Sequence, residues 1–353
     1  MEQHNNIRLV KNNFDLLRLL FAVVVCLVHT HFLSGFQELN WITHVFSSEI
    51  AVRAFFVLSG FLIFMSYERS SSLSSYFNKR LRRIYPAYFT VVIIFAIGLV
   101  TISSYGFEDY FSSVWVKYAL ANFAFLNFVQ HELPGVFETN KMSAVNGALW
   151  TLKIEVMFYL TVPLFVYLIR KFSLLPILAI IYLSSVVYVE LLSVMAEQSE
   201  SPVYKILSYQ LPGQLSYFIA GAFFYYYLPI FERYIVSFLV SAVSILIINI
   251  FYSLPFLEPF SLAAVVIFFG LFSYLGNFGK FGDFSYGVYI LHFPIIQILI
   301  YTGCFHDAPW QFLIAVVFTT LIGAIALWHM VEKKFLLRKN HYVAATTPKS
   351  DGV

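Results

Sequence analysis

Charge is scarce in this sequence. Only 12% of its 353 residues are Asp, Glu, Lys or Arg, whereas a soluble domain contains about 25%. Hydrophobic residues make up 60% of the chain and aromatic residues 20%. This composition excludes a water-soluble globular protein. At roughly 20 apolar residues per membrane-spanning helix, the apolar residues suffice for about ten spans.

Cysteine is also nearly absent, since the chain has only Cys26 and Cys304. Two cysteines exclude a disulfide framework, and neither belongs to a pair with metal-ligand spacing, so no metal is expected. The chain lacks the strict alternation of apolar and polar residues that is typical of transmembrane β-barrels. Its long continuous apolar runs indicate an all-α integral membrane protein. The charge pattern does not require a nucleic-acid partner.

Eleven apolar runs are long enough to be considered as spans, and the basic residues between them set the orientation. If the run 115–130 does not cross, sixteen Lys and Arg residues share one side and three lie on the other. This bias predicts that both termini are cytoplasmic. We therefore predict about ten transmembrane helices in one bundle, with 115–130 re-entrant or lying at the membrane surface. The predicted spans are 16–34, 45–66, 84–102, 148–169, 173–192, 209–229, 234–253, 260–276, 284–303 and 310–330.

The composition changes only in the polar first 13 residues, in the serine cluster at 70–75 and in the polar tail after Lys339, and no internal repeat is evident. We therefore predict one membrane domain at 14–335. A cytoplasmic N-terminal tail at 1–13 and a cytoplasmic C-terminal tail at 336–353 flank it.

Ionisable residues inside the predicted spans are the candidate functional residues, because each is costly in hydrocarbon unless it is paired or faces water. Arg18 and His29 share the first span, about 16 Å apart along the helix axis. The predicted orientation places Arg18 near the cytoplasmic end and His29 near the outer end. Arg53, Lys153 and Glu155 fall in the outer parts of other spans. Together with His29 they predict a polar outer cavity.

Five stretches, in order along the chain, resemble motifs of the membrane acyltransferase 3 family, whose members move acyl groups onto envelope sugars. Arg18 and His29, separated by ten residues, resemble its R-x10-H signature. The resemblance extends over about residues 14–335. The other four stretches are AVRAFFVLSGFLI at 51–63, KRLRRIYP at 79–86, ALWTLKIE at 148–155 and SYGVYILHFP at 285–294.

The resemblance implies a ten-helix enzyme of the bacterial cytoplasmic (inner) membrane that takes an acyl-CoA, commonly acetyl-CoA, as its donor. Lys79, Arg80, Arg82 and Arg83 form a cationic cluster that can hold the phosphates of CoA or of anionic membrane lipids. Arg80 and Arg83 share one face if this segment is helical. The resemblance favours Arg80 and Arg83 as CoA-binding residues, and we assign Arg18 to the same donor site.

His29 is the predicted general base, which takes a proton from the acceptor hydroxyl as that hydroxyl attacks the thioester. Glu155 is the second predicted catalytic residue, and it either orients His29 or pairs with Arg53. A cation, Arg53 or Lys153, is expected to stabilise the developing oxyanion. The residues assigned to the acceptor are Arg53, Trp150, Lys153 and His292.

The predicted function is O-acylation, most simply O-acetylation, of a hydroxyl on a cell-envelope polysaccharide or lipopolysaccharide sugar such as O-antigen. The acyl group must cross much of the bilayer. Either the CoA arm threads into the bundle, or a side chain such as Ser59 or Cys26 carries the acyl group covalently. The alternative function is a transporter or flippase of a lipid-linked sugar, since intramembrane charges also suit a substrate pathway.

Overall fold

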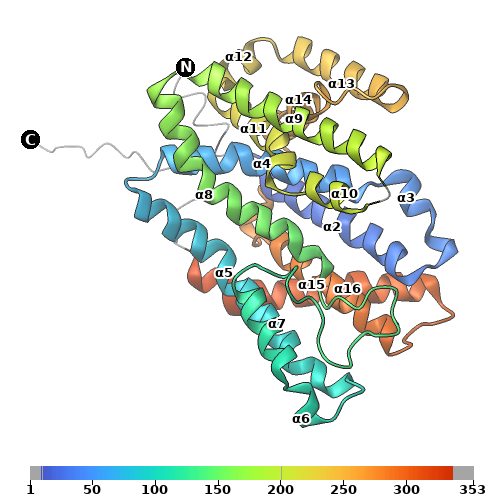
Figure 1. Ribbon diagram of the computed structural model, residues 1–353. Helices are drawn as coiled ribbons and strands as arrows, with labels where there is room; N and C mark the ends of the chain where they lie inside the picture. The colour runs from blue at the N-terminus through green and yellow to red at the C-terminus, as the bar shows by residue number, and fades with distance from the viewer. Residues whose placement is uncertain (1–8, 10, 200, 337–353) are drawn as a thin grey trace, which may run out of the picture.

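The computed structural model describes residue 9, residues 11–199 and residues 201–336. Within these ranges it is helical throughout, without a strand (Figure 1). Ten of the described helices have 14 residues or more: α2 (Phe14–Ser34), α4 (Ser48–Glu68), α5 (Leu73–Gly98), α8 (Trp150–Lys171), α9 (Leu174–Gln198), α11 (Leu211–Tyr226), α13 (Ile235–Phe251), α14 (Glu258–Leu271), α15 (Ser285–Tyr301) and α16 (Pro309–Leu327).

Short elements connect the long helices. They are η1 (Gln37–Leu39), α3 (Trp41–Val45), η2 (Leu99–Ile102), α6 (Phe107–Tyr110), α7 (Ser113–Phe123), η3 (Gly147–Leu149), α10 (Val203–Ser208), α12 (Leu228–Arg233), η4 (Phe278–Lys280), the π-helical turn η5 (Trp328–Glu332) and α17 (Lys333–Phe335).

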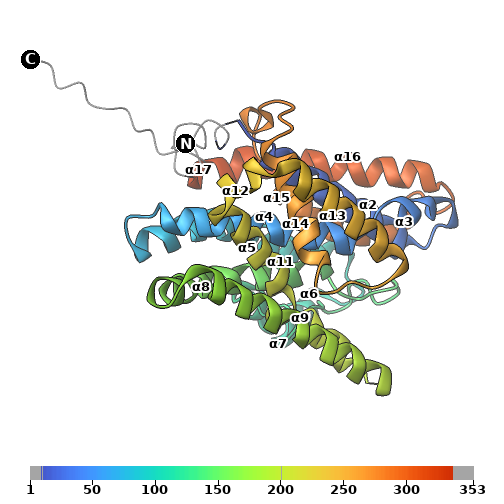
Figure 2. The ribbon, with the colours of Figure 1, turned by 90° about the horizontal axis from the view of Figure 1, so that it is seen from above.

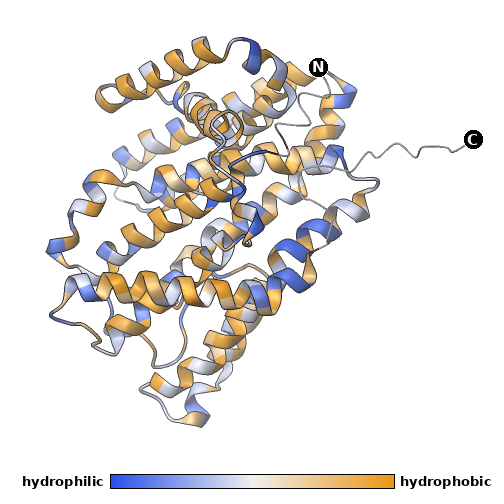
Figure 3. Cartoon of the chain, turned by 180° about the vertical axis from the view of Figure 1, so that it is seen from behind, coloured by the Kyte–Doolittle hydropathy of each residue, from blue (hydrophilic) through white to orange (hydrophobic). Residues whose placement is uncertain are grey.

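Among the described residues, six helical segments are long and apolar enough to cross a membrane, and α13, α14 and α15 are shorter apolar helices. Figure 3 shows hydrophobic residues along most of the length of the helices. On α13, for example, Val236, Val240 and Ile247 are exposed. A surface of this kind suits contact with lipid, so the chain is a multi-pass membrane protein. The predicted all-helical fold is confirmed, whereas the ten crossings and the cytoplasmic termini stay predictions.

The run 115–130 contains a short helix followed by irregular chain. α7 has 11 residues, which makes it about 16 Å long, and the hydrocarbon core is about 30 Å thick. Residues 124–146 then form turns and coil. Asn140 and the buried Gln297 fasten this segment to α15, since the Asn140 Nδ2 donates to Gln297 Oε1 at 3.1 Å and the Gln297 Nε2 donates to Ala144 O at 2.8 Å. The segment therefore covers α15 without forming a helix that could span the bilayer.

α4 lies in the middle of the bundle, between α8 and α9 on one side and α16 on the other (Figure 2). It crosses α11 at close range because both helices have a glycine at the contact. A Cβ on Gly60 would lie 1.8 Å from the Phe218 carbonyl oxygen, and one on Gly221 would lie 2.0 Å from the Val57 carbonyl oxygen. Small residues at such crossings let membrane helices pack backbone to backbone. This contact fixes the position of α4, which contributes residues to both cavities described below.

The predicted tails lie mostly outside the described residues. Residues 1–8, 10 and 337–353 are among those not described. At the start of the domain, the backbone N–H of Asn13 donates to Gly270 O at 2.8 Å, and its Nδ2 donates to Phe269 O at 2.8 Å. The buried Asn13 thereby anchors the entry to α2 against the end of α14.

Candidate active site

Three arginines from two helices line one cavity. Arg80 and Arg83 come from α5 and Arg18 from α2, and the wall is completed by residues of α4, α8 and α15. We call it the arginine cavity; its volume is about 70 Å³. The segment 79–86 is helical, as the shared face of Arg80 and Arg83 requires. The structure therefore brings together the three residues predicted for the donor site.

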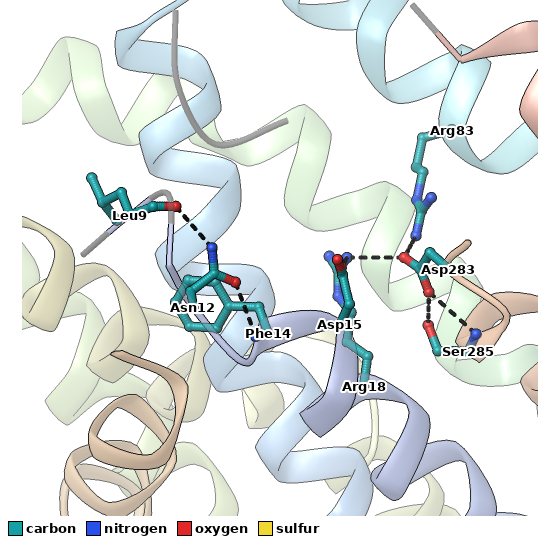
Figure 4. Close-up of polar contacts among 8 residues, drawn as sticks. All are labelled: Leu9, Asn12, Phe14, Asp15, Arg18, Arg83, Asp283 and Ser285. Carbon is teal, nitrogen blue, oxygen red and sulfur yellow. Dashed lines mark hydrogen bonds and ion pairs between the residues drawn. The ribbon is translucent and has the colours of Figure 1, made fainter. Parts of the chain in front are cut away.

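Asp283 holds two of these arginines in place. Figure 4 shows Arg83 and Arg18 reaching its carboxylate from two helices. Arg83 Nη2 donates to Asp283 Oδ2, and Arg18 Nη1 lies 3.5 Å from the same oxygen. The backbone N–H of Ser285 donates to the other oxygen at 3.2 Å. Burial alone would raise the pKa of Asp283, but Arg83, Arg18 and a hydrogen bond that the Ser285 hydroxyl donates to Asp283 Oδ1 hold this pKa below its usual range.

Arg80 is less fully paired than Arg83. Its Nη2 donates to Ser66 Oγ at 2.6 Å, and its guanidinium lies 5.7 Å from the ring centroid of Tyr159. Its Nε–H is buried and has no hydrogen-bond partner among the described residues. A buried donor without a partner is costly, so this N–H is suited to receive an anionic group in the cavity.

Glu155 also lines the arginine cavity, about one turn from Tyr159 on α8. The Tyr159 hydroxyl donates to Glu155 Oε1 at 2.5 Å. The sequence predicted that Glu155 orients His29 or pairs with Arg53. The structure places it instead with Tyr159, in the same cavity as Arg80.

His29 and His292 form a direct pair between α2 and α15. His29 Nδ1 lies 2.9 Å from His292 Nε2, and His292 Nδ1 lies 3.1 Å from the carbonyl oxygen of Val288. A carbonyl oxygen can only accept, so in the neutral pair His292 Nδ1 carries the hydrogen and its Nε2 is an acceptor. His29 Nδ1–H must then donate to His292. This leaves the Nε2 of His29 with a free lone pair.

Tyr289 separates the histidine pair from the arginine cavity. Its side chain lines that cavity, and its ring centroid lies 5.9 Å from that of His292. Its hydroxyl forms a 2.7 Å hydrogen bond with Thr151 Oγ1. One aromatic ring on α15 thus stands between the three arginines and the two histidines.

The remaining predicted residues lie elsewhere. Arg53 binds Glu49 at 2.6 Å and Glu258 at 2.8 Å, and all three line a second cavity of about 440 Å³ between α4, α9, α10, α11 and α14. Lys153 Nζ donates to Gln210 Oε1 at 2.6 Å. The Trp150 ring lies against that of Tyr209, which lines the second cavity, with centroids 5.7 Å apart.

The prediction of one polar outer cavity is therefore wrong. The predicted spans place four residues at a similar depth in the membrane: His29, Arg53, Lys153 and Glu155. In the structure, these residues lie on different faces of their helices. The structure places His29 in a histidine pair, Glu155 in the arginine cavity and Arg53 in the second cavity. Lys153 binds Gln210 and lines neither cavity.

Sequence reasoning missed Asp283 and Glu332. Asp283 lies two residues before Ser285, the first residue of the SYGVYILHFP stretch. Its position next to this motif was the sequence signal that could have identified it as a site residue. Glu332 ends the π-helical turn η5; it is 3% exposed, and neither carboxylate oxygen has a hydrogen-bond partner in the described part of the chain. Across the described ranges, no three His, Cys, Asp or Glu side chains form a group suited to a metal.

Comparison with known proteins agrees with these motifs. Residues 11–329 match the family described as "Acyltransferase domain". The chain belongs to the acyltransferase 3 family. This acyltransferase is 28% identical over 350 residues to the O-acetyl transferase of Shigella phage Sf6, a match that covers 93% of this chain and 97% of the relative.

Two further relatives match parts of this acyltransferase. Nodulation protein 10 of Rhizobium leguminosarum bv. viciae is 34% identical over 172 residues, which is 46% of each chain. Acyltransferase MdmB of Streptomyces mycarofaciens is 31% identical over 157 residues, or 42% of this chain and 37% of the relative. No solved structure matches the acyltransferase.

Proposed function

We propose that this acyltransferase is an O-acetyltransferase of the bacterial cytoplasmic membrane. It moves an acetyl group from cytoplasmic acetyl-CoA to a hydroxyl of a cell-envelope polysaccharide or lipopolysaccharide sugar. The observation that carries the proposal is the His29–His292 hydrogen bond, because it leaves one imidazole nitrogen of His29 free as a base.

Arg18, Arg80 and Arg83 form the donor site in this proposal. CoA carries phosphates, and guanidinium groups bind phosphate through short, charge-assisted hydrogen bonds. The free Nε–H of Arg80 supplies one such donor. The narrow pantetheine arm extends from the arginines along the cavity towards Tyr289, which contacts His292. Ser59 is buried and lines the same cavity, so it stays the candidate for a covalent carrier, whereas Cys26 is buried beside Thr30 on α2.

The reaction is a direct acyl transfer. His29 Nε2 takes the proton of the acceptor hydroxyl while the hydroxyl oxygen attacks the thioester carbonyl carbon. The tetrahedral intermediate collapses with cleavage of the carbon–sulfur bond. The proton on His29 then passes to the leaving thiolate, which gives free CoA and an O-acetyl ester. His292 is a positioning residue, since it holds His29 in the tautomer that has a basic Nε2.

A transporter or flippase of a lipid-linked sugar is the alternative. Membership of an acyltransferase family favours acyl transfer over this alternative. The two also differ in their products, because acyl transfer consumes acetyl-CoA and releases CoA, whereas a flippase does neither.

The test uses cells that lack the gene, complemented with wild type, His29→Ala, His292→Ala or His292→Gln at equal membrane levels. Ester-linked acetyl on surface glycans and CoA release by isolated membranes are measured. Loss of a general base costs about 10²- to 10⁴-fold, so we expect His29→Ala to abolish both signals. His292→Ala is expected to be impaired, and His292→Gln to recover part of the activity because an amide oxygen can accept from His29 Nδ1.

His44→Ala is the matched control, since His44 is an exposed histidine on α3. It is expected to behave as wild type. Full acetylation with His29→Ala would overturn the assignment of the base. Wild-type membranes that release no CoA, with the sugar still crossing the bilayer, would replace acyl transfer with the flippase function.

A further inference from the structure

The second cavity is the larger of the two and has a different lining. Its volume of about 440 Å³ falls in the range of small-molecule sites, about 300–1,000 Å³. Three tyrosines line it, Tyr204, Tyr209 and Tyr217, and we call it the tyrosine cavity. Its polar groups also include the amide of Gln214 and the hydroxyl of Ser208. Aromatic faces together with amide, hydroxyl and carboxylate groups are suited to a ligand rich in hydroxyls, such as a sugar.

The charges of the tyrosine cavity exclude most anionic ligands. Four carboxyl groups line it, those of Glu49, Glu190, Glu197 and Glu258, against two cations. One of the cations, Arg53, is already bound to two of these glutamates, and its guanidinium lies 5.1 Å from the centroid of the Tyr217 ring. A uronate or phosphate would therefore meet an excess of negative charge, whereas a neutral sugar would find acceptors for its hydroxyls.

The tyrosine cavity adjoins the arginine cavity across one wall. On α4, Arg53 faces the tyrosine cavity while its neighbour Val52 lines the arginine cavity. On α8, Trp150 contacts Tyr209 while its neighbour Thr151 lines the arginine cavity. The two cavities thus share α4 and the start of α8 as a partition.

The histidine pair lies on the other side of this partition. His29 pairs with His292 on α15, and Tyr289, which contacts His292, packs its ring against Phe55 of α4 with centroids 5.7 Å apart. A sugar in the tyrosine cavity is therefore not the one that receives the acetyl group.

We propose that the tyrosine cavity is a subsite for a non-reacting, uncharged sugar unit of an extended glycan acceptor. This inference rests on the proposed acetyl transfer. Binding a remote unit supplies energy that holds the reacting unit beside His29, so an oligosaccharide is a better acceptor than its single sugars.

The first test compares acceptors of two lengths. The polysaccharide that gains acetyl in the complementation experiment is de-acetylated and cut into oligosaccharides of one repeat unit, and its component sugars are prepared as methyl glycosides. We expect Tyr209→Ala and Glu190→Gln to lower kcat/KM at least tenfold for the oligosaccharide and to leave the value for the glycoside that accepts acetyl unchanged. The matched controls are Tyr252→Ala and Glu108→Gln, exposed residues outside the cavity lining.

An equal fall on both acceptors, or no fall on the oligosaccharide, would overturn the subsite. Wild-type enzyme that transfers no acetyl to either acceptor would instead count against the proposed function.

The second test does not depend on acetyl transfer. It measures quenching of the Trp150 fluorescence in protein without acetyl-CoA, with Trp150→Phe as the blank.

The fluorescence probes are maltoheptaose, which is neutral, and an oligogalacturonate of equal length. We expect the neutral probe to bind at least five times more tightly to wild type, and the difference to fall below twofold in the Glu190→Gln, Glu197→Gln double variant. Equal or tighter binding of the uronate to wild type, or no quenching by the neutral probe, would overturn the proposal.

Discussion

The arginine cavity and the tyrosine cavity differ in charge although α4 lines both. The first has three guanidinium groups and one carboxyl group in its lining, and the second has four carboxyl groups and two cations. Charges at membrane depth are costly unless they are paired or functional. The opposite signs are consistent with the two proposed ligands, an anionic donor on one side of α4 and an uncharged glycan on the other.

Pairing also differs between the two cavities. Beside the arginine cavity, one carboxylate, Asp283, binds both Arg18 and Arg83, and the Nε–H of Arg80 has no hydrogen-bond partner in the described part of the chain. In the tyrosine cavity, the single Arg53 is shared by two carboxylates. The arginine cavity thus keeps a donor for an anionic ligand, and the tyrosine cavity keeps carboxyl groups that can accept hydrogen bonds from sugar hydroxyls.

The largest effect is expected at Asp283. Asp283→Asn removes the negative charge that Arg83 and Arg18 share and leaves Arg18 with Asp15 at 4.0 Å, and we expect it to lower the free energy of unfolding by about 3 kcal/mol. The pKa of Asp283 lies below its ordinary value in the folded protein, so its contribution is complete above about pH 4 and is lost as the pH falls through the folded-state pKa. Thermal unfolding in detergent should therefore show a constant gap between variant and wild type from pH 5 to 8.

Asp109→Asn, at an exposed carboxylate on α6, is the control for this comparison and should unfold as wild type does. Asp283→Asn could instead unfold at the same midpoint as wild type, or the difference between the two midpoints could disappear between pH 5 and 8. Either result would show that Asp283 does not hold the arginine cavity together.

The next largest effect is expected in the KM values for the two substrates, which distinguish the two cavities. Arg80→Met removes charge-assisted hydrogen bonds worth about 1.5–3 kcal/mol, so we expect the KM for acetyl-CoA to rise about 10- to 100-fold. Arg53→Met should raise the KM for the oligosaccharide acceptor and leave the KM for acetyl-CoA within about twofold of wild type. Steady-state kinetics in which both substitutions raise the same KM would contradict the division into donor and acceptor cavities.

Sequence alone predicted the helices and the shared helical face of Arg80 and Arg83, because both signals are local. Long apolar runs predict helices in lipid, and Arg80 and Arg83 lie three residues apart on one helix. The grouping of Arg53, Lys153 and Glu155 failed for a different reason. Depth along a span follows from position in the sequence, but the face that a residue presents to its neighbours depends on how the helices pack.

The sequence could not predict two of the contacts that site residues make. Asp283 follows Arg83 by 200 residues, and His292 follows His29 by 263, so no local spacing predicts either contact. His292 was identified from its motif and assigned to the acceptor. Its hydrogen bond to His29 gives it a positioning role in the proposed mechanism.

The smallest effect is expected at Tyr217, and it tests whether the carboxylates of the tyrosine cavity are held in place by their neighbours. The Tyr217 hydroxyl donates to Glu258 Oε1 at 3.0 Å, and the same oxygen binds Arg53. Tyr217→Phe removes one hydrogen bond, worth about 1 kcal/mol, and keeps the ring against Arg53. We expect about a fivefold rise in KM for the oligosaccharide, and no change in KM for acetyl-CoA. Because the substitution leaves every charge in place, a rise in the KM for acetyl-CoA would mean that the partition formed by α4 does not isolate the two cavities.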